Sequence, residues 1–212
     1  MIHYNPIDGD ITQRSIKYRP RTCFLMTKLG DPQPKSVKKI RDELDVLLVN
    51  NGIALIDANS ELTGKDFMVK IWEMIISVPL GIAIISDELS VATLENVFYE
   101  LGMFQLLGKE TLVIKTDNST VPSDFVRTEY LEYGSTFKAR INSYVSCFFE
   151  QAEHYLIMAD QLLKEPLLEL DYLKRSYLIS GDKTTRQRIE KLLSTHAFDG
   201  YTSSVYKQIL KY

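Results

Sequence analysis

Short apolar runs alternate with longer segments of helical spacing over the first two thirds of the chain. Strands are predicted for the runs at residues 23–26, 53–56, 81–85, 111–114 and 129–133. Helices are predicted between them at residues 35–49, 64–77 and 91–107. Strands that are apolar throughout are typical of a sheet buried on both faces, and helical crossovers are typical of parallel connections. The sequence therefore predicts an α/β fold with a parallel sheet of about five strands and helices on both faces.

The last third of the chain has a different character. No strand pattern follows residue 137, and apolar residues recur at spacings of three and four up to Pro166. Two further helices are predicted at residues 167–179 and 184–193. We therefore expect an N-terminal extension at residues 1–20, an α/β domain at 21–136 and a C-terminal all-helical region at 137–212.

Composition excludes several classes of function. The formal net charge is −3, so we expect no nucleic-acid partner. The longest apolar run is interrupted by Pro79 and Gly81, so no membrane span is expected. Cys23 and Cys147 are the only cysteines and lie far apart, which predicts neither a zinc site nor a disulfide framework and fits a reducing cytoplasm. No metal and no bound cofactor are expected.

One glutamate stands out on the segment at residues 91–107. On a helical wheel of about 100° per residue, Glu100 falls within the apolar arc of this helix, with Val97 and Phe104 close to it. A carboxylate on an apolar face must be paired, protonated or functional, because burial of an unpaired charge is unfavourable. Asn96 lies one turn earlier on the same side and is predicted to orient Glu100 by a hydrogen bond.

Polar residues follow the predicted strands at the point where ligands bind in open parallel sheets. The candidate binding residues after the first three strands are Thr27, Lys28, Leu29 and Gly30, then Asp57, then Ser86 and Asp87. Backbone N–H groups of the loop at residues 28–30 are candidates to hold a phosphate, because Gly30 permits close approach. Structural alternatives remain: Asp57 and Asp87 could cap the next helices, and Glu100 could pair with a buried Lys or Arg.

Three segments together resemble a known family. They are residues 23–30 (CFLMTKLG), residues 96–102 (NVFYELG) with Gly108 and Lys109, and residues 121–125 (VPSDF) before Tyr130. These segments resemble the TIR-like, nucleoside 2-deoxyribosyltransferase-like proteins over roughly residues 21–135. The resemblance implies a flavodoxin-like core and attack at the anomeric carbon of a ribosyl group, with Glu100 as the catalytic carboxylate.

Two departures from the family pattern narrow the expected reaction. True deoxyribosyltransferases carry an aspartate in the third-strand region, which here reads Gly81-Ile82-Ala83-Ile84-Ile85, and residues 103–106 (MFQL) replace the usual small residues. The resemblance therefore implies an N-glycosidase that cleaves NAD or a related nucleotide as its substrate, and it is consistent with a regulated effector of the antiviral-defence type. The alternatives are a salvage deoxyribosyltransferase and a non-catalytic nucleotide sensor.

The helical region carries more apolar side chains than one side of a small α/β core needs. They include Tyr144, Phe148, Phe149, Tyr155, Leu162, Leu167, Leu170, Tyr172, Leu173, Tyr177 and Ile179. Large apolar surfaces mark interaction sites. We therefore expect these helices to mediate homo-oligomer formation or docking of a partner protein.

Overall fold

The computed structural model of the chain describes residues 9, 16–60, 64, 66–122, 130–198 and 200–211. The strands are β1 (Thr22–Met26), β2 (Ala54–Ile56), β3 (Leu80–Ile85), β4 (Glu110–Lys115) and β5 (Tyr130–Glu132). The helices are α1 (Lys35–Asn50), α2 (Phe67–Ser77), α3 (Val91–Leu106), α4 (Phe137–Gln161), α5 (Pro166–Ser180), α6 (Lys183–Thr195) and α7 (Gly200–Ile209). The predicted motif residues Ser123, Asp124 and Phe125, and the predicted first residue of the fifth strand, Glu129, lie outside the described residues.

All five strands form one parallel sheet in the order β2-β1-β3-β4-β5. The central strands β1 and β3 are buried at every position, as expected for strands that are apolar throughout. This strand order is that of flavodoxin-like folds. The predicted α/β class, parallel pairing and flavodoxin-like arrangement are therefore confirmed.

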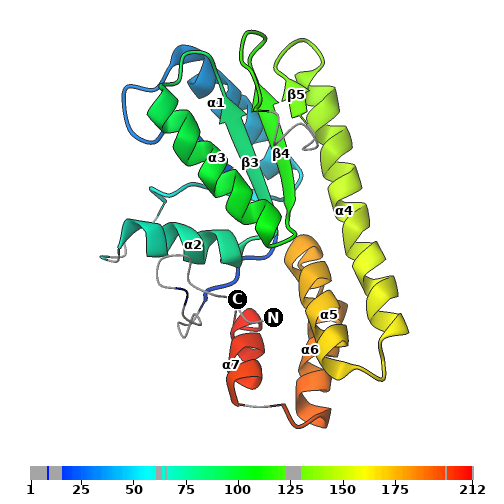
Figure 1. The fold of residues 1–212 in the computed structure, drawn as a ribbon. Helices are drawn as coiled ribbons and strands as arrows, with labels where there is room; N and C mark the ends of the chain where they lie inside the picture. The colour runs from blue at the N-terminus through cyan, green and yellow to red at the C-terminus, as the bar shows by residue number, and fades with distance from the viewer. Residues whose placement is uncertain are drawn as a thin grey trace. The chain divides into compact units, whose positions relative to one another are not determined.

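Helices α1 and α3 cover opposite faces of the sheet, with α3 in front of β3 and β4 and α1 behind (Figure 1). The close approach of α3 depends on Gly81 in β3, because a Cβ atom there would lie 2.9 Å from ring atoms of Phe104. The Phe104 ring also lies 6.0 Å from the ring of Phe24 in β1. Phe104 thus fixes α3 against the two central strands.

Helix α1 buries one apolar stripe and begins without a side-chain cap. Its buried residues are Val37, Ile40, Leu44, Leu47 and Leu48. It begins after Pro34, whose side chain cannot accept a hydrogen bond, and it has no acidic residue in its first turn. It ends at the turn through Gly52, which has a φ of 69°. The first N–H groups of α1 therefore lack an acceptor within the helix.

The chain packs as two compact units, each built from separate segments. The α/β unit contains Thr22–Gly64 and Leu80–Ser146. The helical unit contains residues 16–21, α2 and the chain from Cys147 onward. The division expected from the sequence ran between residues 136 and 137. In the structure the boundary instead falls inside α4, and α2 is grouped with the C-terminal helices.

Helix α2, which is grouped with the helical unit, is apolar at eight of its eleven positions. Its buried residues are Lys70, Ile71, Trp72, Met74, Ile75, Ile76 and Ser77. The predicted apolar face also included Phe67, which is half exposed. The helix begins at Phe67 rather than at Gly64, because the side chain of Asp66 caps the N–H groups of Met68 and Val69.

Five of the eleven apolar residues that were predicted to be in surplus lie in the core of the helical unit. Phe148, Leu170, Leu173, Tyr177 and Ile179 are buried, whereas Leu167 is exposed. The segment at residues 16–21 joins this core: Tyr18 is buried and its hydroxyl accepts a hydrogen bond from Lys174 Nζ at 3.0 Å. The final helix, α7, was not predicted. None of the helices in the described part of the chain has the length and hydropathy of a membrane span.

Candidate functional site

The carboxyl ends of β1 and β3 lie side by side at the centre of the sheet. Met26 of β1 pairs with Ala83 of β3, and the chain leaves the two strands in opposite directions, toward α1 and toward α3. In sheets of this order, ligands bind at this switch in strand order. The loops after these two strands hold Thr27, Lys28, Leu29, Gly30, Ser86 and Asp87. The topology therefore brings six of the predicted site residues to one edge.

The loop after β1 contains a buried hydroxyl and a lysine that bonds within its own loop. Thr27 is buried, and its Oγ1 has no hydrogen-bond partner among the described residues. Lys28 donates from Nζ to the carbonyl of Pro32 at 2.6 Å, and Leu29 is half-buried. Gly30 is exposed with a φ of 77°, a conformation that favours glycine. The exposed backbone at Gly30 is therefore the part of this loop that is open to a ligand, because Thr27 Oγ1 is buried and the Lys28 ammonium already has one acceptor.

The start of α1 joins this edge through a residue that sequence reasoning missed. Ser36, in the first turn of α1, lies with its Oγ 3.1 Å from Oγ of Ser86. Ser86 is fully buried and its Oγ also accepts from the N–H of Glu88. The N-terminus of a helix attracts anions. The sequence could have indicated Ser36, because it stands in the first turn of the helix that follows the first strand. Such a helix begins at the carboxyl edge of a parallel sheet, where the loop after that strand lies.

Asp57 follows β2, and both of its carboxylate oxygens are engaged. It is buried, and its Oδ2 lies 2.6 Å from Nη2 of Arg41 in α1. Its Oδ1 accepts from the N–H of Asn59 at 2.9 Å and from the hydroxyl of Ser60 at 3.1 Å. These contacts give Asp57 a structural role in joining the turn after β2 to α1.

Asp87 lies on the surface and connects two loops of the edge. Its Oδ1 accepts a hydrogen bond from the hydroxyl of Thr116, which follows β4, at 3.0 Å. The nearby Ser119 is buried and donates to the carbonyl of Thr116 at 2.7 Å. Asp87 therefore fixes the loop after β3 against the loop after β4 and still exposes part of its carboxylate.

Glu100 lies on the side of α3 that faces β1. Phe104 reaches Phe24 of β1, and Glu100 precedes Phe104 by one turn, so it projects from the same side of the helix. Phe24 pairs with Gly81, so the next residues toward the carboxyl edge on this face are Met26 and Ala83. Glu100 is expected over these two side chains, about 13 Å along α3 from its first residue. Since Met26 is the last residue of β1, this register places Glu100 at the carboxyl end of that strand.

The surroundings of Glu100 favour its neutral form. The side chain is partly buried, and burial raises its pKa from the usual 4.5 to about 7. No hydrogen bond or ion pair of its carboxylate occurs with any residue that the structure describes. The structural alternative of a buried salt bridge is therefore not observed in this part of the chain. An unpaired carboxylate with a pKa near 7 is typical of functional sites.

Asn96 does not make the contact that was predicted for it. Its side chain is exposed, and among the described residues it has no hydrogen bond to Glu100. The helical wheel placed the two residues on one side of α3, but Asn96 lies further round toward solvent than Glu100.

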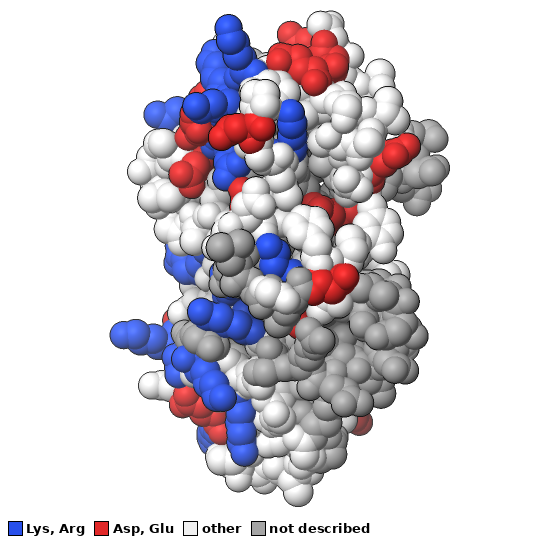
Figure 2. All heavy atoms as spheres, turned by 90° about the vertical axis from the view of Figure 1, so that its left-hand side faces the viewer, with Lys and Arg blue, Asp and Glu red and all other residues white. Residues whose placement is uncertain are grey.

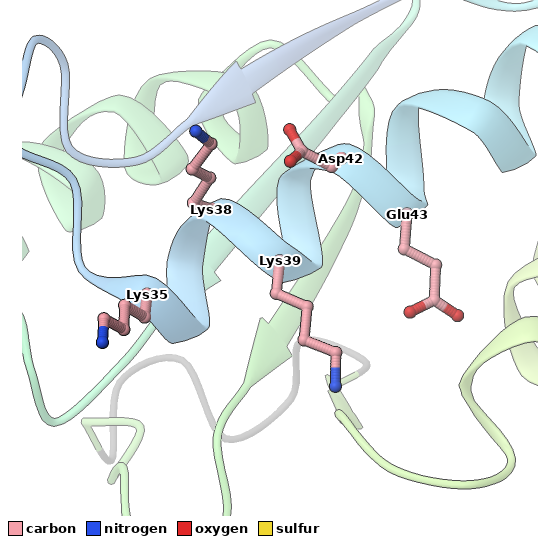
Figure 3. A pocket seen from close by; sticks show the side chains of 5 residues that line it. All are labelled: Lys35, Lys38, Lys39, Asp42 and Glu43. Carbon is pink, nitrogen blue, oxygen red and sulfur yellow. The ribbon is translucent and has the colours of Figure 1, made fainter.

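A hollow of ≈ 510 Å³ lies along α1 and is lined by Lys35, Lys38, Lys39, Asp42 and Glu43. Figure 3 shows Lys35, Lys39 and Glu43 on one side of the helix and Lys38 and Asp42 on the other. Glu43 accepts a hydrogen bond from the Tyr133 hydroxyl at 2.7 Å. Since α1 and α3 cover opposite faces of the sheet, this hollow is separate from Glu100. Its lining carries both signs of charge, and in the upper part of Figure 2 basic and acidic side chains also lie next to one another.

No protein-family model and no curated protein sequence matches this chain. Among solved structures, a CMP N-glycosidase of Clostridium botulinum is similar with 17% identity and a TM-score of 0.43, over 58% of this chain and 98% of that chain. A 2-deoxyribosyltransferase of Bacillus psychrosaccharolyticus is similar with 12% identity and a TM-score of 0.41, over 56% of this chain and 89% of that chain. At these values neither structure assigns an activity to this chain.

Proposed function

We propose that the protein is an N-glycosidase that cleaves the bond between base and ribose in a nucleotide, with NAD as the favoured substrate. The observation that supports this proposal is Glu100: a partly buried, unpaired carboxylate on the β1-facing side of α3. Cleavage of an N-glycosidic bond passes through a state with positive charge on the sugar ring. A carboxylate among apolar side chains stabilises such a charge more strongly than one in water.

The reaction requires little beyond this carboxylate if the leaving base is good. The bond between C1′ and the base nitrogen breaks, and its electron pair goes to the base. Glu100 stabilises the resulting cation or bonds to C1′ as an ester. Water then bonds through its oxygen to C1′ and releases a proton to solvent. Where the ester has formed, its C1′–O bond breaks in this step and the electron pair returns to the Glu100 carboxylate. Nicotinamide in NAD is cationic and leaves as a neutral molecule, so one carboxylate is sufficient, which is the reason to favour NAD.

The edge between β1 and β3 supplies a place for the phosphate groups. The N-terminus of α1 has no side-chain cap, and its free N–H groups together with the hydroxyl of the half-buried Ser36 are suited to bind phosphate. The loop at residues 28–30 adds backbone N–H groups. A nucleotide with its phosphate at this edge would direct its sugar along the α3 side of β1, toward Glu100. This arrangement favours a phosphorylated substrate over a free nucleoside.

The test is to incubate the purified protein with NAD, nucleoside monophosphates and nucleosides, and to measure released base by chromatography. The Glu100→Gln variant retains the volume but lacks the charge, so we expect base release to fall at least a hundredfold. The control is Glu95→Gln on the same helix, where an exposed carboxylate is removed and release should be unchanged.

Three other outcomes would contradict the proposal. Wild-type turnover in Glu100→Gln would exclude a catalytic role for this carboxylate. Exchange of one base for another, without net hydrolysis, would favour a salvage deoxyribosyltransferase. Binding of NAD or nucleotides by calorimetry without any cleavage would favour a non-catalytic sensor.

A further inference from the structure

Two lysines on one side of α1 line the hollow, and neither forms an ion pair within the described chain. Lys35 and Lys39 project from the same side of the helix (Figure 3). Residues four apart on a helix have Cβ atoms roughly 5–6 Å apart, so both ammonium groups can reach one bound group. Among the residues that the structure describes, no carboxylate lies within ion-pair distance of either lysine. This part of the chain therefore does not neutralise the two positive charges.

Glu43 is the acidic residue best placed to pair with Lys39, but it is engaged elsewhere. It follows Lys39 by one turn, and its Oε2 accepts a hydrogen bond from the Tyr133 hydroxyl at 2.7 Å. The Lys39 ammonium lies 5.5 Å from the centre of the Tyr133 ring. This cation–π contact positions the ammonium group and leaves its N–H donors available. Tyr133 therefore holds both side chains without an ion pair between them.

The order of charges along α1 is unfavourable for the helix by itself. A helix is stabilised by acidic residues in its first turn and by basic residues in its last turn. The first turn of α1 has no acidic residue and begins with Lys35, and Lys38 and Lys39 follow within the next four positions. Lysines at spacings of three and four also repel one another. An anion beside Lys35 and Lys39 would offset both effects.

We propose that Lys35 and Lys39 bind a phosphate-bearing small molecule in this hollow, on the face of the sheet opposite α3. Phosphate oxygens accept charge-assisted hydrogen bonds from lysine, and a phosphate matches the charge of the two ammonium groups. The volume of ≈ 510 Å³ lies within the range of about 300–1,000 Å³ that is typical of small-molecule sites. Asp42 and Glu43, one turn further along α1, would repel a longer polyanion such as a nucleic acid.

This site is separate from the phosphate position proposed at the edge of the sheet, and it does not depend on the proposed reaction. Calorimetry with pyrophosphate as the probe tests it without any turnover. The wild type should bind pyrophosphate. Its affinity should fall at least about tenfold in the double variant Lys35→Gln/Lys39→Gln, because each lysine supplies a charge-assisted hydrogen bond.

Two control variants locate the bound pyrophosphate. Lys38 lines the same hollow but projects from the other side of α1 (Figure 3), so Lys38→Gln should keep the wild-type affinity. Ser36→Ala removes a hydroxyl at the edge, and binding that depends on Lys35 and Lys39 should persist in it. Loss of binding in Ser36→Ala, with retention in the double lysine variant, would place pyrophosphate at the edge and overturn the proposal. So would a wild type that does not bind pyrophosphate.

Melting temperatures give a readout that a purely structural role of the lysines would not reproduce. Without pyrophosphate, the double variant should melt no lower than the wild type, because the charges it removes oppose the helix dipole and repel one another. Pyrophosphate should raise the melting temperature of the wild type and leave that of the double variant unchanged. Sodium chloride at equal ionic strength is the control for screening. Equal stabilisation by sodium chloride, or a double variant that melts lower in buffer without pyrophosphate, would contradict the proposal.

Discussion

Replacement of Glu100 by glutamine should stabilise the protein at alkaline pH and leave its stability nearly unchanged at acid pH. Burial raises the pKa of Glu100 from 4.5 to about 7, so the folded protein holds this proton more tightly than the unfolded chain does. Between these two pH values the folded state binds more protons. The stability of the wild type therefore falls as pH rises through this window, and levels off above about pH 7.

The size of the effect follows from the same two values. The difference between 4.5 and about 7, at about 1.36 kcal/mol per pH unit, is on the order of 3 kcal/mol. Because the side chain is only partly buried, we expect about 2 kcal/mol of this to be realised. Glutamine cannot ionise and avoids this loss. Glu100→Gln should therefore gain about 2 kcal/mol over the wild type at pH 8.

Urea unfolding and thermal melting at pH 5 and pH 8 measure this gain. For a chain of this size, about 2 kcal/mol corresponds to roughly 4–8 °C in melting temperature. Glu95→Gln is the control, since an exposed carboxylate on the same helix should show no such dependence on pH. The reasoning is refuted if Glu100→Gln shifts the melting temperature equally at both pH values, or if it destabilises the protein at pH 8.

Three further predictions concern the sheet, the edge and the reaction. Gly81→Ala places a Cβ atom 2.9 Å from the Phe104 ring and should lower the free energy of unfolding in urea by about 1–3 kcal/mol, whereas Gly102→Ala should raise it by up to about 1 kcal/mol. Arg41→Met removes the ion-pair partner of the buried Asp57 and should lower the free energy of unfolding by about 2 kcal/mol at pH 7. An unchanged urea midpoint would show that the hydrogen bonds from Asn59 and Ser60 are sufficient for this carboxylate. If ionised Glu100 is the active form, kcat/KM for base release should rise about tenfold per pH unit up to about pH 7 and then level off; a flat profile between pH 5 and 9 would count against it.

The sheet could be predicted because parallel strands buried on both faces are apolar at every position. The predicted ends of β1, β3 and β4 lie within one or two residues of the observed ends, because Gly, Pro and Asp mark the turns beside these strands. The end of α1 was also clear from the Asn50-Asn51-Gly52 turn. Helix α7 was missed because it has only ten residues and its first half, Gly-Tyr-Thr-Ser-Ser, has low helix propensity.

Only part of the candidate site could be predicted, because several of its contacts join residues that are far apart in the sequence. Glu100 was found because a charge on an apolar helical arc is a local signal. Asp57 resembled a ligand residue, but its partner Arg41 lies sixteen residues earlier on another element, and no local pattern indicates that pair. The Ser36 contact to Ser86 joins residues fifty positions apart. Asn96 was misjudged because the wheel gives an angle but not the solvent boundary.

The membership of α2 in the helical unit bears on how the chain folds during its synthesis. The α2 segment leaves the ribosome before β3, but the helices with which it forms a compact unit begin at Cys147, about 70 residues later. At a synthesis rate of roughly 5–20 residues per second, the apolar side chains of α2 remain without these helices for several seconds. During this time Ile71, Trp72 and Ile75 are open to chaperones and to aggregation. A chain that stops near Ser146 leaves them uncovered permanently, so we expect the α/β unit to be insoluble when translation is truncated there.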